Sequence, residues 1–246
     1  MEVHTHSHTA RKKWTHYLWE FLMLFLAVFC GFLAELQLEH KIEKDREIQF
    51  IKSLVADLQD DKTILPKNIT VNQSRNLLMD SFLTIISNPE LLKQNGNNVY
   101  YMARMGPRIA TLVNNTKTFD QLKNSGSFRL IRSNETADNI MEYYNKIPQI
   151  KKLEDLYLEE FAHYKTLAAK IFDPVVFRSM ERDNGDISRD ANNPQLRTTN
   201  TDVLKEFGVY IVYMNGTTRG IVPLEEDLLQ NAGKLLDYLK AHYHLD

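Results

Sequence analysis

The residues best suited to chemistry in this sequence are histidines and glutamates near its amino terminus. His4, His6 and His8 alternate in the first ten residues, and an extended chain would present their imidazoles on one side to a divalent metal. Three imidazoles on an unanchored tail would bind loosely, so these residues are candidates for a loosely held metal only. His242 and His244 are poorer candidates because residues two apart on a helix point away from each other.

Two glutamates stand at the ends of the most apolar stretch of the chain. Phe21 to Ala34 has no charged residue, with Glu20 directly before it and Glu35 directly after it. A helix would place the two carboxylates about 22 Å apart, against a hydrocarbon core of about 30 Å. Both carboxylates could therefore snorkel to the headgroups. Alternatively, Glu20 could face a neighbouring helix or a water-filled path and share a proton with His16, one turn earlier.

The element that would position these residues is a membrane-spanning helix. Nine residues between positions 21 and 34 are Phe, Leu or Val, which together favour insertion by roughly 3 to 5 kcal/mol. A basic flank and an aromatic belt precede them, the order expected at a membrane interface. These interface residues are Arg11, Lys12, Lys13, Trp14, Tyr17 and Trp19. We therefore predict a transmembrane helix with its aromatic belt over residues 14–38, with Leu18 to Leu38 crossing the bilayer.

Other readings of the apolar stretch are a cleaved signal peptide, a lipoprotein signal and a buried helix. Cleavage after Ala34 would require a small residue at Phe32, which disfavours a cleaved signal. A lipoprotein would need a small residue before Cys30, where Phe29 stands. Cys30 is also the single cysteine, so no disulfide can form within the chain. An uncleaved anchor is the preferred reading, and the signal peptide and the buried helix stay open.

The remaining sequence predicts an all-α protein in which the transmembrane helix continues into a soluble helical bundle. Residues 1–13 form a short polar, His-rich tail, 39–47 a charged helical stalk and 48–246 a soluble domain of five to seven helices. Ile51, Val55 and Leu58 repeat at helical spacing, for packing within the domain or for self-association. Pro66 is expected to kink or end that helix, and Pro223 to open the last one.

Local signals refine the soluble domain. Thr118 and Gln121 have the spacing of a capping box, Gly126 suits a left-handed helix end, and Ser133 is placed to cap the next helix. Residues 88–98 and 181–200 read as loops because they are rich in Asn, Gly and Asp. Residues 202–215 are predicted as a helix, with a strand as the alternative because of their β-branched and aromatic residues.

Three segments carry a family resemblance. HTHSHTARKKWTHYLWEFLMLFLAVFCGFLAE, EHKIEKDREIQFIKSLVADL and TFDQLKNSGSFRLI together resemble a family of small membrane proteins of Bacteroidota that carries a domain of unknown function. The resemblance implies a single inner-membrane helix followed by a helical domain in the periplasm, and it implies no reaction or ligand. This orientation agrees with the compact basic cluster before the helix, although Lys41, Lys44, Arg46 and Lys52 follow it closely.

Composition limits the possible functions. The formal net charge is -2, with 30 basic and 32 acidic residues spread along the chain, so a nucleic-acid partner is not expected. No catalytic triad, metal cluster or glycine-rich phosphate loop can be recognised, so we expect no cofactor, no small-molecule substrate and no enzyme. The leading hypothesis is a membrane-anchored interaction or scaffold module that binds a protein partner or itself. The alternatives are a subunit of an ion- or proton-coupled assembly using Glu20 and, third, a membrane-tethered hydrolase.

Overall fold

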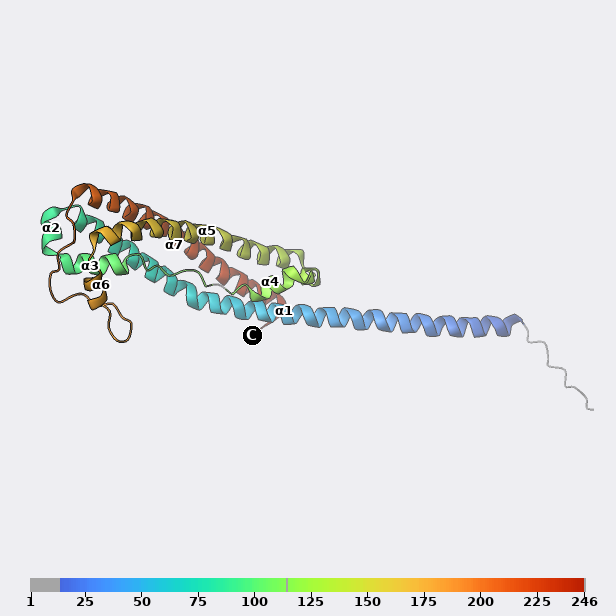
Figure 1. The fold of residues 1–246 in the computed structure, drawn as a ribbon. Helices are drawn as coiled ribbons and strands as arrows, with labels where there is room; N and C mark the ends of the chain where they lie inside the picture. The colour runs from blue at the N-terminus through green and yellow to red at the C-terminus, as the bar shows by residue number, and fades with distance from the viewer. Residues whose placement is uncertain (1–13, 114, 246) are drawn as a thin grey trace, which may run out of the picture. The chain divides into compact units, whose positions relative to one another are not determined.

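The computed structural model describes residues 14–113 and 115–245, and these residues form helices joined by loops. The chain consists of two units, Met1–Gln49 and Phe50–Asp246. Three long helices dominate (Figure 1): α1 (Trp14–Ile86), α5 (Asn134–Ile171) and α7 (Thr201–Tyr243). The shorter elements are α2 (Pro89–Gln94), α3 (Gly96–Met105), α4 (Lys117–Asn124), the 3-10 helix η1 (Ser127–Leu130) and α6 (Pro174–Ser179). The prediction of an all-α protein is confirmed for this part of the chain.

The second unit is a bundle in which α5 and α7 pack along each other (Figure 1). The α1 residues from Phe50 onward supply a further face, as in the edge-to-face contact of Phe82 with Phe207, whose ring centroids are 5.8 Å apart. The predicted stripe on α1 is buried in this core: Ile51, Val55 and Leu58 are at most 8% exposed. These residues therefore pack within their own domain.

Neither predicted helix boundary at a proline is found: Pro66 does not end its helix, and Pro223 does not open the last one. α1 continues through Pro66 to Ile86, and α7 contains Pro223 in its interior. An internal proline removes one hydrogen bond and crowds the preceding turn, at a cost of about 3 kcal/mol. Here apolar residues on both sides of each proline are buried, including Leu65 and Ile69 in α1. Tertiary packing of the whole helix outweighs the local cost.

Local predictions had mixed outcomes. Gly126 adopts the left-handed conformation with φ 67°, and the Ser133 hydroxyl accepts a hydrogen bond of 3.2 Å from the Thr136 N–H, both as expected. The capping box is wrong because α4 already begins at Lys117, which places Thr118 inside the helix.

Two further outcomes concern segments predicted as loops or as a possible strand. Residues 88–98 form short helices rather than a loop, with the Asn88 side chain capping α2. The strand alternative for residues 202–215 is also wrong, because they belong to α7. The loop prediction for residues 181–200 is confirmed, with one isolated bridge between Glu181 and Ile187.

Candidate functional site

The amino-terminal part of α1 is an exposed apolar helix. Its most apolar window of eighteen residues has a mean hydropathy of 2.2, and none of it is buried among the described residues. Phe21, Leu24 and Val28 are 64%, 69% and 73% exposed. The helix is long and apolar enough to cross a membrane. The apolar stretch of a signal sequence would also lie near the amino terminus and have a similar composition. The exposure disfavours the alternative of a buried core helix.

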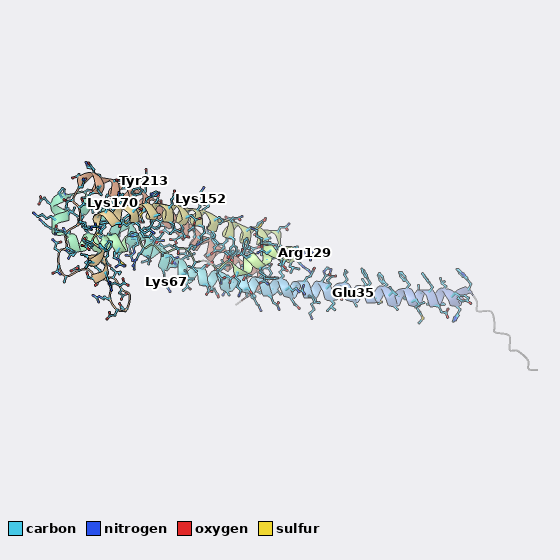
Figure 2. The ribbon with its side chains drawn as sticks, viewed as in Figure 1. Glu35, Lys67, Arg129, Lys152, Lys170 and Tyr213 are labelled. Carbon is cyan, nitrogen blue, oxygen red and sulfur yellow. The ribbon has the colours of Figure 1, made fainter. Side chains whose placement is uncertain are left out.

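The predicted polar and interface residues of this helix are partly described. His16 Nε2 lies 3.1 Å from Glu20 Oε1, so the predicted pairing of these two side chains is present. Trp14, Tyr17 and Trp19 are 78%, 56% and 64% exposed, as an interfacial belt requires. Glu35 is exposed fifteen residues after Glu20 on α1 (Figure 2). His4, His6, His8, Arg11, Lys12 and Lys13 lie outside the described residues.

A buried polar network lies inside the second unit and was not predicted from the sequence. Its centre is Asn72 on α1, which is fully buried and binds both backbone polar groups of Ala110, in the connecting segment that joins α3 to α4. The Asn72 amide donates to the Ala110 carbonyl at 3.0 Å, and its oxygen accepts from the Ala110 N–H at 2.8 Å. Asn72 also donates to Glu225 Oε2 on α7 at 3.1 Å. One asparagine therefore ties three parts of the fold together.

Glu154 and Lys151 on α5 hold the next part of the same segment. The Leu112 N–H donates to Glu154 Oε1, and Lys151 Nζ donates to the Leu112 carbonyl. Lys151 Nζ also lies 3.0 Å from Glu154 Oε2, although the Glu154 side chain is only 7% exposed. Because buried backbone groups need partners, these two side chains compensate for placing an irregular segment inside the bundle.

Asp61 and Tyr143 form the third part of the network. The Tyr143 hydroxyl donates to Asp61 Oδ2 at 2.7 Å, and the Asn115 N–H donates to Asp61 Oδ1 at 3.1 Å. Burial raises the pKa of Asp61, while these two hydrogen bonds act in the opposite direction. Burial likewise raises the pKa of Tyr143, with a further contribution from the Asp61 charge, so the phenol stays protonated and remains a donor.

Glu225 is the carboxyl group of the network whose pKa is shifted furthest from its ordinary value. It is fully buried, and burial raises its pKa to about 7; the Asn72 hydrogen bond lowers the pKa and the Glu154 charge raises it. Its Oε1 has no hydrogen-bond partner within the described ranges. The helical spacing of Ile221, Glu225 and Leu228 points all three to the core, and this signal could have identified Glu225 from the sequence.

The polar network serves the fold more directly than a reaction. Its carboxylates and amides bind the backbone of Ala110, Leu112 and Asn115 or one another, and the network's members are largely buried. Among the described residues no group of three or more His, Cys, Asp or Glu side chains is arranged to hold a metal ion. The network therefore rigidifies the bundle, and a binding role is better sought at the surface.

The second unit has two larger surface hollows. The apolar groove, of about 1030 Å³, lies between the end of α1, α2 and the first half of α7. Val209, Val212 and Tyr213 line it and are 51%, 53% and 61% exposed (Figure 2 labels Tyr213). The second hollow, of about 560 Å³, lies between α3, α5, α6 and Arg197. We call it the cationic pocket because Arg104, Arg108, Lys165 and Arg197 line it, together with aromatic side chains that form its floor. Both have the size of small-ligand sites.

Comparisons with models of protein families, with curated proteins and with solved structures find no match to this chain.

Proposed function

We propose that this chain is a single-pass membrane protein whose helical domain binds a protein partner, or a second copy of itself, beside the membrane. The observation that carries the proposal is the exposure of the apolar helix, because such a surface is unfavourable in water. We further propose an inner-membrane location, with the amino terminus in the cytoplasm and the helical domain in the periplasm. The interaction role is not enzymatic and needs no cofactor.

The apolar groove supports the interaction part of the proposal. Val209 and Val212 are three residues apart on α7 and Tyr213 follows directly, so their side chains project from neighbouring positions on the helix surface. Exposed apolar surface of this kind, next to a groove between helices, is typical of surfaces that receive a partner helix.

Site-specific photocrosslinking tests the interaction. We expect a photoreactive phenylalanine analogue at Val212 to form a covalent adduct in membranes, either with a second copy or with one defined partner. Val175 on α6 is the matched control, since it is a valine that is 73% exposed and does not line the groove. Adducts from both positions alike, or from neither, would contradict a specific interaction at the groove.

A cysteine placed in the helical domain tests the proposed orientation. In a Cys30→Ser background, Lys67→Cys on α1 provides a single thiol at an exposed position (Figure 2). We expect a maleimide that crosses the outer membrane but not the inner membrane to label it in intact cells. Labelling only after the inner membrane is opened would place the domain in the cytoplasm instead.

A second candidate function is a subunit of a proton- or ion-coupled membrane assembly. The observation that favours it is the distance of 3.1 Å between His16 Nε2 and Glu20 Oε1, since an acid inside an apolar helix is by default a site hypothesis. Glu20→Gln removes the acid and retains its size. If assembly and cellular phenotype are unchanged in this variant over the accessible pH range, the second candidate should be dropped.

A further inference from the structure

We infer that the cationic pocket binds a small organic anion, a phosphate or carboxylate that carries an apolar or aromatic body. This inference goes beyond the proposed interaction role and does not depend on it. The four cationic residues that line the pocket are Arg104, Arg108, Lys165 and Arg197. The four aromatic residues that line it are Phe161, Tyr164, Phe172 and Phe177. No acidic residue lines it.

The aromatic floor is packed and in contact with the cations. The rings of Phe172 and Phe177 stack with centroids 5.2 Å apart. Lys165 Nζ lies 4.7 Å from the centroid of the Phe161 ring, and the Arg104 guanidinium lies 5.7 Å from that of Phe177. A flat apolar group entering the pocket would therefore meet ring surfaces and find positive charge at its edge.

Two of the arginines are held in place by backbone carbonyls. Arg104 Nη1 donates to the Phe177 carbonyl at 2.5 Å, and Arg197 Nη1 donates to the Ala169 carbonyl at 3.1 Å. A guanidinium has five N–H donors, so each arginine retains others for an anion. Arginines positioned in advance bind phosphate or carboxylate with less loss of side-chain entropy.

Nearby acidic groups offset this charge only in part. Glu181 Oε2 lies 3.7 Å from Arg104 Nη2, a long contact to a side chain that is 55% exposed. Asp173 precedes the pocket residue Pro174, but its carboxylate accepts a hydrogen bond of 2.8 Å from the Val175 N–H at the start of α6. Like charges gathered around an apolar hollow repel one another, and an anion with an apolar body would relieve that repulsion while covering the rings.

The pocket's size agrees with this ligand class. A volume of about 560 Å³ suits a molecule of one or two rings, or a short alkyl chain, with one anionic group. A soluble metabolite and the headgroup region of an anionic lipid share this chemistry. The experiment below has separate arms for these two sources.

The test uses the full chain in nanodiscs of zwitterionic lipid and 1-naphthyl phosphate as the probe, measured by equilibrium dialysis against empty nanodiscs. We expect saturable binding that weakens when monovalent salt rises from about 50 mM to about 500 mM. The Arg108→Glu and Lys165→Glu double variant should lose about tenfold or more in affinity. The matched control, Lys67→Glu with Lys152→Glu, makes the same change in net charge at exposed positions outside the pocket (Figure 2) and should stay within about twofold.

Further arms separate the anionic part from the apolar part. Inorganic phosphate and neutral 1-naphthol should each bind more weakly than 1-naphthyl phosphate, because each offers only half of the complementary surface. Anionic lipid in the nanodisc should compete with the probe if a lipid headgroup is the natural ligand, and should leave binding unchanged if a soluble anion is. Absence of saturable binding would overturn the inference, as would equal losses in the two double variants or inorganic phosphate binding as tightly as the probe.

Discussion

Asn72 Nδ2 donates a hydrogen bond of 3.1 Å to Glu225 Oε2, although 153 residues separate them in the sequence. Both side chains are fully buried. The bond joins α1 to α7, and Asn72 also binds both polar groups of Ala110 in the connecting segment. The interior of the bundle is therefore specified by polar contacts as well as by apolar packing, and one of those contacts includes a carboxyl group with a strongly raised pKa.

Glu225 should make the stability of the fold depend on pH. Burial raises its pKa from 4.5 to about 7, so the folded state holds a proton that the unfolded state releases at lower pH. The resulting stability is fully present below about pH 4.5 and is lost as the pH rises through about 7. Between about pH 4.5 and pH 8, the wild type should lose on the order of 3 kcal/mol more than Glu225→Gln.

Unfolding followed by circular dichroism across this pH range measures the difference between wild type and Glu225→Gln. Glu226→Gln is the control, because Glu226 is the sequence neighbour and its only described contact is an exposed hydrogen bond of 3.1 Å from Gln73. The control should follow the wild-type profile. Parallel profiles for wild type and Glu225→Gln would show that Glu225 is not the group responsible.

Tyr143→Phe should destabilise the bundle. The change removes the hydrogen bond of 2.7 Å to Asp61 Oδ2 and leaves a carboxylate that is 1% exposed with the Asn115 N–H as its remaining described donor. Loss of a donor to a buried charged group costs about 1 to 3 kcal/mol in the free energy of unfolding. Tyr213→Phe, at a side chain that is 61% exposed, should change it by less than about 0.5 kcal/mol. Similar effects of the two substitutions would contradict the role assigned to Asp61.

Two glycine substitutions should change stability in opposite directions. A Cβ at Gly96 would lie 2.0 Å from the Pro194 carbonyl oxygen, so Gly96→Ala must displace the loop and should cost about 1 to 3 kcal/mol. A Cβ at Gly216, inside α7, would meet nothing within 4 Å. Gly216→Ala should therefore stabilise by about 0.5 to 1 kcal/mol through better helix propensity. Thermal unfolding of both variants gives the signs, and equal signs would contradict the packing at Gly96.

The helical class of the fold and its main core stripe could be predicted from the sequence because both depend on periodicity. Ile51, Val55 and Leu58 recur at helical spacing, and the structure buries all three. The helix boundaries could not be predicted where proline gave a local signal that tertiary packing overrides. Pro66 and Pro223 both lie inside long helices for this reason.

The candidate sites also fall into those that the sequence could predict and those that it could not. The apolar helix and the His16–Glu20 pair are local in sequence, so spacing alone predicted that pair, which lies at 3.1 Å. The contacts of Asn72 with Glu225 and Ala110 join distant segments, and residue spacing carries no information about such pairings. The cationic pocket likewise combines residues from three helices and from the separate loops that contain Arg108 and Arg197, and no local sequence pattern links them.

Cys30 allows the most direct test of the central claim, that the apolar helix is retained and lies in a membrane. It is the single cysteine of the chain and lies on the exposed apolar part of α1. We predict that a membrane-impermeant maleimide leaves Cys30 unlabelled in intact membranes and labels it after unfolding in SDS. Labelling of Cys30 in intact membranes, or recovery of the protein in the aqueous fraction with or without this helix, would contradict the claim.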